Sequence, residues 1–313
     1  MSIVVLKPGL QTTIQAGPRT GLRHLGVPAS GAADPLSLAL ANRLVGNRWD
    51  APALELTLLG PALRFEKECA FAVSGATAAV SLNGNSVSFH ETIVADAGDE
   101  LEIGAAEEGA RCYLAVAGGF DADDVLGSSS TYLAAGLGGL QGRALEQGDI
   151  LRFSPRTCDA LRTPVEFQVP MSSSWGLRTS PSFEFQLLTD ESVKYLFDSN
   201  WTVSRRADRI GVQLEGATLE VSSDGRMPSA AVFPGTVQCP ESGTPYVLLA
   251  DAGTVGGYPR IAQVVRADRH LLGQLRPGDH VRFLRRDAAT AAEELRAKHE
   301  YWRPWLEDIA EII

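Results

Sequence analysis

The sequence predicts a mainly β protein with barrel-like lobes and a few short helices. Glycine and proline are frequent, at 31 and 17 residues, and short apolar runs recur between these turn signals. Three segments share a Gly-Asp turn followed by alternating apolar residues, which is typical of half-buried strands. They read AGDELEIG (97–104), QGDILRFS (147–154) and PGDHVRFL (277–284). Repetition of such units favours barrels or sandwiches over a parallel sheet with crossover helices.

Length, composition and charge limit the number of domains and the kinds of partner to expect. The chain has 313 residues, which at roughly 150 residues per domain suggests two domains or one large bilobed domain. A hydrophobic content of 44% with 21% charged residues is ordinary for a globular protein. The formal net charge is −10 and no run of Lys or Arg stands out, so nucleic acid and anionic membranes are not expected partners.

Cysteine usage and the N-terminus indicate the compartment. The four cysteines are far apart and form no CxxC pair, which favours structural thiols in a reduced compartment over a disulfide or zinc framework. The opening stretch MSIVVLKPGL contains an apolar run too short for a signal peptide or a membrane span. We therefore expect a cytoplasmic protein.

A buried helix that carries polar residues is expected in the stretch GVPASGAADPLSLALANRLVGN (26–47). Asp34 is placed to cap the helix, because Pro35 suits the first helical position, and Gly46 is placed to end it. The apolar side chains cover a wide arc; Ser37 lies within this arc and Asn42 lies just beyond its edge. Asp34 and Ser37 either serve the helix itself, as a cap and as a bond to the preceding turn, or face a ligand.

The remaining elements follow in chain order. Residues 71–89 contain two strand-like runs joined at Asn83-Gly84, a strong hairpin signal. A stretch rich in Ser, Thr and Pro (154–181) marks the boundary between lobes, and we consider an edge strand at 165–169 within it. The expected domains are an N-terminal barrel lobe (1–160), a C-terminal barrel lobe (161–286) that repeats the first in weaker form, and a helical tail (287–313) interrupted at Pro304.

Two glycine-rich polar stretches interrupt the strand pattern. Glycine lets a backbone approach a ligand closely, and hydroxyl and guanidinium groups hold carboxylate or phosphate oxygens. The same stretches are also compatible with barrel corners and tight turns. Their polar and glycine positions are Ser128, Thr131 and Arg143 in residues 113–149, and Gln238, Asp251, Thr254, Gly256, Gly257 and Tyr258 in residues 235–264.

Sequence motifs exclude several kinds of site. There is no GxxxxGK[ST] nucleotide loop, and GLGGLQGR (136–143) does not satisfy GxGxxG because position 141 is Gln. There is no GxSxG elbow and no HExxH pair, and the five histidines are not spaced as metal ligands, so no metal site is expected. His24 is a candidate general base, although a lone histidine is more often structural or exposed.

Several stretches together resemble one family. They are similar, in the same order, to those of the biotin-dependent carboxyltransferase family, also called the allophanate hydrolase subunit 2 family. The resemblance covers about residues 3–286 and leaves out only the terminal helix. The stretches are GVPASGAAD with SLALANRLVGN, RCYLAVAGGFD with LGSSST, GLGGLQGRALEQGD, GVQLEG, and GGYPRIAQV with ADRHLLGQLRPGDHVRF.

The resemblance implies two cyclophilin-like β-barrel lobes with a substrate cleft between them. Within the family the chain is most similar to the C subunit of 5-oxoprolinase, which acts with the A and B subunits and couples ATP hydrolysis to opening the lactam of 5-oxoproline to glutamate. This implies a small amide or lactam substrate, ATP with Mg²⁺ shared with a partner subunit, and activity only in the complex. Two alternatives stay open: a biotin-dependent carboxyltransferase acting on urea or a similar amide with carboxybiotin from another protein, and a non-catalytic regulator that antagonises a kinase inhibitor.

The chain departs from the family pattern at polar positions. QAGPR (15–19) has Ala16 in place of an acid. DAGTVGGYP (251–259) has Ala252 and Gly253 in place of Arg and Gln, and SAA (229–231) has Ala230 and Ala231 in place of Glu and Gly. Because a substrate can contact such side chains, these positions bear on which amide the protein accepts.

A hypothesis for substrate opening assigns roles by chemistry. Resonance protects the carbonyl of a lactam or urea, and its activation builds negative charge that fixed donors must stabilise. We expect acidic and imidazole groups to transfer protons, and basic, amide, hydroxyl and glycine positions to bind the substrate. The catalytic candidates are His24, Asp34 and Asp251, and the substrate-binding candidates are Arg19, Ser37, Asn42, Ser128, Thr131, Arg143, Gln238, Thr254, Gly256, Gly257 and Tyr258.

Overall fold

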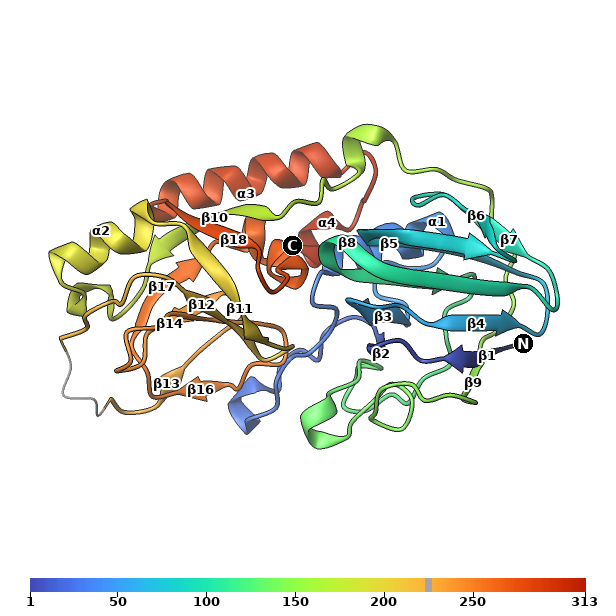
Figure 1. The fold of residues 1–313 in the computed structure, drawn as a ribbon, viewed down its shortest axis with the longest axis horizontal. Helices are drawn as coiled ribbons and strands as arrows, with labels where there is room; N and C mark the ends of the chain where they lie inside the picture. The colour runs from blue at the N-terminus through green and yellow to red at the C-terminus, as the bar shows by residue number, and fades with distance from the viewer. Residues whose placement is uncertain (223–226) are drawn as a thin grey trace. The chain divides into compact units, whose positions relative to one another are not determined.

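The computed structural model describes residues 1–222 and 227–313, and it divides into two compact units (Figure 1). The first unit comprises Met1–Arg19, Ser30–Met171 and Trp302–Ile312, and the second comprises Thr20–Ala29, Ser172–Tyr301 and Ile313. The expected tail is therefore divided. Its long helix belongs to the second unit up to Tyr301, Trp302–Ile312 belong to the first, and Ile313 belongs to the second.

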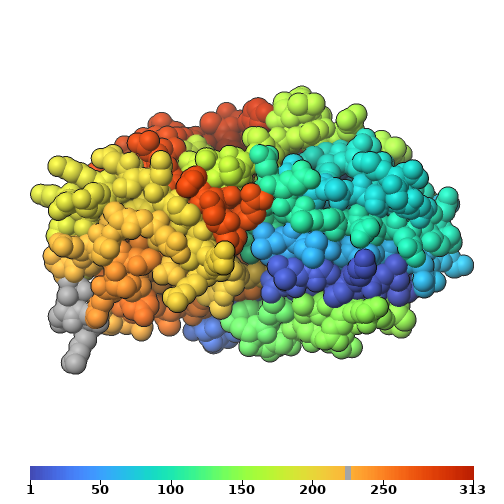
Figure 2. All heavy atoms as spheres, viewed as in Figure 1, coloured from blue at the N-terminus to red at the C-terminus, as the bar shows by residue number. Residues whose placement is uncertain are grey.

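The first unit is built on a nine-stranded antiparallel sheet. Its main path runs β2-β3-β8-β4-β1-β9, and the long strand β5 pairs with β8, β6 and β7. The N-terminal strand β1 alternates buried and half-buried residues, and Figure 2 shows it at the surface of this unit. The strands are β1 (Ser2–Lys7), β2 (Gln11–Gln15), β3 (Ala53–Thr57), β4 (Ala62–Phe65), β5 (Cys69–Leu82), β6 (Asn85–Ser86), β7 (Ile93–Ala95), β8 (Glu100–Val116) and β9 (Ile150–Arg152).

The core of the first unit follows from strand alternation. Ile3 and Val5 of β1 are buried together with Leu63 and Phe65 of β4, the strand that pairs with it. The ring of Phe65 stacks on that of Phe71, with centroids 5.3 Å apart. Full burial of such a side chain contributes about 1.5–3 kcal/mol, so these inward positions hold the sheet together.

The helix α1 (Pro35–Leu44) confirms the helix predicted from the sequence. Asp34 caps it, because one carboxylate oxygen accepts from the backbone N–H groups of Leu36 and Ser37 at 3.1 and 3.0 Å. Gly46 follows its C-terminus at φ 70°, a left-handed conformation that favours glycine. The helix packs on β5 and β8 through a second buried cluster that includes Leu38 and Leu44.

The predicted turns are also confirmed. Asn83 and Gly84 lie at φ 53° and 78°, and the flanking residues Leu82 and Asn85 pair between β5 and β6. Each Gly-Asp turn directly precedes a strand, namely β8, β9 and β18 (His280–Arg285). The three turn glycines have positive φ, between 89° and 97°.

The second unit contains a closed barrel with the strand order β10-β17-β14-β15-β12-β11-β18. The barrel closes through the parallel pair β10 and β18, and β13 and β16 form a separate two-stranded sheet. The predicted mainly β fold is therefore confirmed, with one closed barrel and one half-barrel sheet. The remaining strands are β10 (Ser174–Pro181), β11 (Trp201–Ala207), β12 (Gly211–Glu215), β13 (Ala230–Ala231), β14 (Thr236–Gln238), β15 (Tyr246–Leu248), β16 (Val255–Gly256) and β17 (Arg260–Val264).

Helices are few outside α1. They are α2 (Asp190–Asp198), α3 (Ala288–Trp302), α4 (Ile309–Ile312) and five short 3-10 segments, Arg23–Leu25, Leu133–Ala135, Val165–Phe167, Phe185–Leu187 and Arg266–Gln274. In the described part of the chain, no helix is long and apolar enough to cross a membrane. As predicted, Pro304 falls in a break, between α3 and α4.

The edge strand considered at 165–169 is wrong. Val165–Phe167 forms a 3-10 turn, flanked by Pro164 and Pro170. Proline has no N–H to donate to a strand ladder, so pairing is interrupted on both sides. The turn also directs Phe167 onto the ring of Trp302, with centroids 5.4 Å apart.

Candidate functional site

The polar residues of α1 are bonded within the first unit. Asp34 is fully buried, and its second carboxylate oxygen accepts from Ser37 Oγ at 2.6 Å. The backbone N–H of Asp34 donates to the hydroxyl of Tyr113 at 2.8 Å. Asn42 donates to the carbonyls of Trp49 and Ala51 at 3.1 and 2.9 Å, so it ties the helix to the loop that follows.

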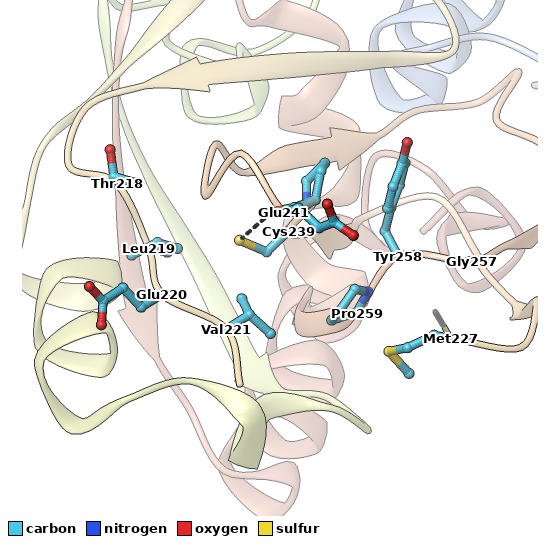
Figure 3. Close-up of a pocket in the computed structure, with 11 residues that line it drawn as sticks. Thr218, Leu219, Glu220, Val221, Met227, Cys239, Glu241, Gly257, Tyr258 and Pro259 are labelled. Carbon is cyan, nitrogen blue, oxygen red and sulfur yellow. Dashed lines mark hydrogen bonds between the residues drawn. The ribbon is translucent and has the colours of Figure 1, made fainter. Parts of the chain in front are cut away.

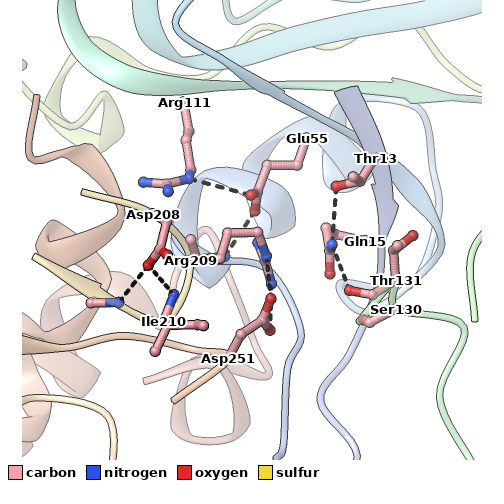
Figure 4. Close-up of polar contacts among 12 residues, drawn as sticks. Thr13, Gln15, Glu55, Arg111, Ser130, Thr131, Asp208, Arg209, Ile210 and Asp251 are labelled. Carbon is pink, nitrogen blue, oxygen red and sulfur yellow. Dashed lines mark hydrogen bonds and ion pairs between the residues drawn. The ribbon is translucent and has the colours of Figure 1, made fainter. Parts of the chain in front are cut away.

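A buried cluster beneath α1 was missed in the sequence. Glu55, fully buried on β3, accepts from the hydroxyl of Tyr113 at 2.8 Å and from Ala33 N–H at 2.9 Å. Arg111 lies 3.3 Å from the other oxygen of Glu55 (Figure 4). Burial, followed by the charge of Glu55, raises the pKa of Tyr113 well above its usual value, so this hydroxyl stays a neutral donor. The sequence signal that could have identified Glu55 is the presence of an acid inside the apolar run ALELT (53–57).

Three predicted binding residues meet beside the edge strand β2. Arg19 is 1% exposed, and its guanidinium donates to the carbonyls of Val125, Ser128 and Ser130. Ser128 Oγ donates to Gly17 O at 2.6 Å, and Thr131 Oγ1 donates to Ile14 O at 2.8 Å.

Gln15 of the same edge strand donates to Thr13 Oγ1 at 3.0 Å and to the carbonyl of Thr131 at 3.1 Å (Figure 4). The structure thus brings Arg19, Ser128 and Thr131 together, with their donors directed at the backbone.

Arg143 forms a two-pronged ion pair inside its own turn. Nη1 lies 2.8 Å from one carboxylate oxygen of Asp149, and Nη2 lies 2.8 Å from the other. The hydrogen bonds to Asp149 raise the pKa of Arg143, and the same bonds lower the pKa of Asp149. The guanidinium is therefore engaged by the aspartate of the Gly-Asp turn.

Asp251, in the second unit, is paired with an arginine. Arg209 Nε and Nη2 lie 2.8 and 3.1 Å from its two oxygens, and both residues are 4% exposed (Figure 4). The neighbouring Asp208 accepts from the N–H groups of Ile210 and Gly211 at 2.8 and 3.0 Å. Sequence reasoning selected Asp251 and missed Arg209, which precedes the GVQLEG stretch.

The other predicted residues of this unit lie on two neighbouring segments, which we call the glycine-rich wall (Gln238 with residues 254–258). Gln238 donates to the carbonyl of Tyr258 at 3.2 Å. A Cβ on Gly256 would lie 2.7 Å from Gln238 Nε2, so a larger residue there would displace this amide group. Thr254 O accepts from Val232 N–H at 3.1 Å, and Gly256 pairs with Ala230. The structure therefore assembles Gln238, Thr254, Gly256, Gly257 and Tyr258 in one place.

The segment of residues 20–29 packs with this second unit and carries two polar side chains. His24 is exposed. The guanidinium of Arg23, a residue that sequence reasoning missed, donates to the carbonyls of Val232 and Gly253 and lies over the ring of Phe233, 5.2 Å from its centroid. A cationic group thus lies against the glycine-rich wall.

A hollow of about 300 Å³ adjoins the wall (Figure 3). Gly257 and Tyr258 line it together with apolar side chains that include Leu219 and Val221. Tyr258 is 55% exposed, so its ring is free to contact a ligand. The second unit therefore combines a hollow, a glycine-rich backbone segment and a guanidinium.

A profile described as carboxyltransferase domain, subdomain A and B, matches residues 25–285. The chain belongs to this carboxyltransferase family. It is 37% identical to the C subunit of 5-oxoprolinase from Escherichia coli, over 96% of this chain and 95% of that protein. It is also 37% identical to the C subunit of 5-oxoprolinase from Haemophilus influenzae, over 96% of each chain.

Solved structures agree with the family assignment. The chain superimposes on the Kluyveromyces lactis urea carboxylase with a TM-score of 0.89 and 31% identity. The match covers 95% of this chain and 29% of the K. lactis protein, so the chain corresponds to a part of that larger enzyme.

In this carboxyltransferase-family chain, the N-termini of α1 and α2 do not fit the phosphates of ATP. The N-terminus of α1 is satisfied by Asp34, and that of α2 by Thr189, which accepts from Ser192 N–H at 3.2 Å. Neither helix end is therefore open to a phosphate. Within residues 1–222 and 227–313, no three His, Cys, Asp or Glu side chains are grouped to hold a metal ion.

Proposed function

We propose that this chain is the C subunit of an ATP-dependent 5-oxoprolinase and acts with the A and B subunits to open 5-oxoproline to glutamate. The observation that carries the proposal is the near-complete correspondence with the C subunit of the E. coli 5-oxoprolinase, which covers 95% of that protein at 37% identity. By contrast, the chain corresponds to 29% of the K. lactis urea carboxylase. The enzymatic activity belongs to the complex, in the cytoplasm, rather than to this chain alone.

In this proposal the second unit contributes the substrate-binding groups. The glycine-rich wall offers the backbone N–H of Gly257, next to the β16 pairing, to stabilise negative charge on the lactam oxygen. Gln238 fixes the carbonyl of Tyr258 and thereby the shape of this segment. His24, exposed beside Arg23, is the group we assign to proton transfer.

The first unit contributes rigidity. Asp34, Ser37, Asn42, Arg19 and Thr131 all bond to groups within their own unit. Their buried hydrogen bonds favour a scaffold role over direct contact with the lactam. We assign ATP to the partner subunits, because the N-termini of α1 and α2 are both capped by side chains of this chain.

The deciding experiment is co-expression of the chain with its A and B subunits, followed by an assay of glutamate released from 5-oxoproline. We expect release that requires ATP and all three chains. Complex formation without any turnover would instead support a regulator that antagonises a kinase inhibitor.

A second candidate function is a biotin-dependent carboxyltransferase acting on urea or a similar amide. The superposition on the urea carboxylase, with a TM-score of 0.89, favours it. Its test supplies a biotinylated carrier protein, bicarbonate, ATP with a biotin carboxylase, and urea. Consumption of urea together with no reaction on 5-oxoproline would select this function over the first.

A further inference from the structure

The guanidinium groups first expected to bind an anion are already engaged. Arg19 donates to three backbone carbonyls, and Arg143 is paired with both oxygens of Asp149. 5-Oxoproline carries a carboxylate, and carboxylates are bound most strongly by a guanidinium with free N–H donors. A guanidinium that binds the carboxylate would therefore belong to another arginine.

Arg23 differs from the paired arginines of its unit. Arg178, Arg209 and Arg260 each form an ion pair with a carboxylate, those of Asp268, Asp251 and Glu184. Arg23 has no such partner among the described residues. Its acceptors are the carbonyls of Val232 and Gly253, which carry no net charge.

Burial makes this arrangement costly without a ligand. Nη1 of Arg23 is buried and has no hydrogen-bond partner in the described part of the chain. A buried cationic donor that lacks an acceptor lowers stability, so it is usually satisfied by water, an ion or a ligand. Burial also lowers the pKa of Arg23 below its usual value, and no carboxylate among the described residues offsets this effect.

The backbone and Phe233 hold this guanidinium in place. Its Cζ lies over the ring of Phe233, and the two carbonyls both accept from Nη2. These carbonyls belong to the segments that flank Thr254 and Gly256, since Val232 bonds to Thr254 and Ala231 pairs with Val255. A planar donor fixed in this way is already oriented for a carboxylate before the ligand arrives.

We propose that Arg23 binds the carboxylate of the substrate, with Nη1 as the donor that completes a charge-assisted contact. The inference rests on the proposed function and assigns it a specificity-determining residue. Binding the carboxylate at Arg23 would present the lactam ring to the glycine-rich wall. The protein would then prefer small amides that carry an anionic group over neutral amides of the same shape.

The test compares 5-oxoproline with 5-oxoprolinamide, in which a neutral amide replaces the carboxylate. Both are assayed as substrates of the complete complex and as ligands by calorimetry. We expect Arg23→Ala to raise the KM and Kd for 5-oxoproline by about tenfold to a hundredfold. The same substitution should change the values for 5-oxoprolinamide by less than about threefold. Arg23→Lys should recover part of the loss, because it keeps the charge without the planar fork.

The matched control is Arg285→Ala. Arg285 belongs to the same unit and also stacks on aromatic rings, 5.3 Å from the centroid of Phe185 and 5.6 Å from that of Phe197. It is exposed and lies outside the wall, so the control should bind both ligands as the wild type does. Thermal melting of each variant separates unfolding from loss of the contact.

Each outcome decides a separate question. Equal losses for both ligands, or no loss for either, would overturn the role of Arg23 while leaving the 5-oxoprolinase proposal intact. If the wild-type complex bound 5-oxoproline without turnover and Arg23→Ala abolished that binding, Arg23 would be supported and the proposed activity would fall. A wild-type complex that neither binds nor opens 5-oxoproline would overturn both proposals.

Discussion

The two units differ in how the unpaired backbone groups at the edges of their sheets are protected. In the second unit, β10 and β18 pair along six registered positions and close the barrel, so the ladder has no free edge there. In the first unit, β2 stays at the end of the strand path. Its edge is instead covered by residues 128–145, since Thr131 N–H donates to Ile14 O and Leu145 N–H donates to Thr12 O.

This difference explains where hydroxyl groups are concentrated. Irregular backbone that covers an edge cannot form a complete ladder, so side chains must supply the missing bonds. Ser130 Oγ accepts from Ala16 N–H at 2.9 Å, and the guanidinium of Arg19 donates to a carbonyl of the covering segment, that of Ser128. The hydroxyl-rich stretch LGSSST thus has a structural use in the first unit.

Removal of Arg19 tests the covered edge most severely. Arg19→Ala leaves the buried carbonyls of Val125, Ser128 and Ser130 without their donor. We expect the free energy of unfolding to fall by about 3–5 kcal/mol, measured by denaturant titration. The control is Arg64→Ala, which removes a surface pair with Glu66, each side chain 41% exposed, and should cost less than about 0.5 kcal/mol. Similar small losses in both would show that the edge is held by other bonds.

Acidification compares one buried histidine in each unit. Burial lowers the pKa of His90 to about 4, and it lowers that of His270 well below its usual value, with further lowering from Lys298 and Arg178. The pKa of such a histidine is lower in the folded protein than its value of 6.5 in the unfolded chain. As the pH falls, the unfolded chain therefore takes up the proton first, and protonation favours unfolding. Stability is therefore full above pH 6.5 and is lost as the pH falls toward 4.

For His90 the expected loss between pH 7 and pH 5 is about 2 kcal/mol. His90→Asn should remove it, because Asn tolerates the φ of 60° at this position. Unfolding titrations at pH 7 and pH 5 provide the measurement. A variant with the same pH dependence as the wild type would assign the effect to other groups.

Substitution of Asp34 separates a cap from a catalytic acid. Asn caps helices about as well as Asp, so Asp34→Asn should keep most of the stability and turnover within about threefold of the wild type. Asp34→Ala should cost about 1–2 kcal/mol in the free energy of unfolding. A hundredfold loss of turnover in Asp34→Asn, with stability unchanged, would instead show that the carboxylate of Asp34 takes part in the reaction.

Removal of Arg143 should have the smallest effect. Its ion pair with Asp149 is partly exposed, at 31% and 14%, so solvent weakens it. We expect Arg143→Ala to lower the free energy of unfolding by about 1 kcal/mol or less and to keep turnover within about threefold. Lost turnover at an unchanged melting temperature would instead identify Arg143 as a substrate-binding residue.

Local signals predicted the local structure well. The Asp34-Pro35 cap, the Asn83-Gly84 hairpin and the three Gly-Asp turns depend on neighbouring residues, and all were found as predicted. Roles that depend on distant partners were not readable. Glu55, Tyr113 and Arg23 bond to residues far along the chain, and the sequence alone does not show these partners.

The parallel pair of β10 and β18 joins the first and last strands of the barrel. A growing polypeptide emerging from the ribosome would hold β10 without its neighbour for about a hundred residues of synthesis. Cotranslational folding of this unit must therefore wait until Arg285 has left the exit tunnel, and a nascent chain stalled earlier would expose an unpaired ladder to chaperones.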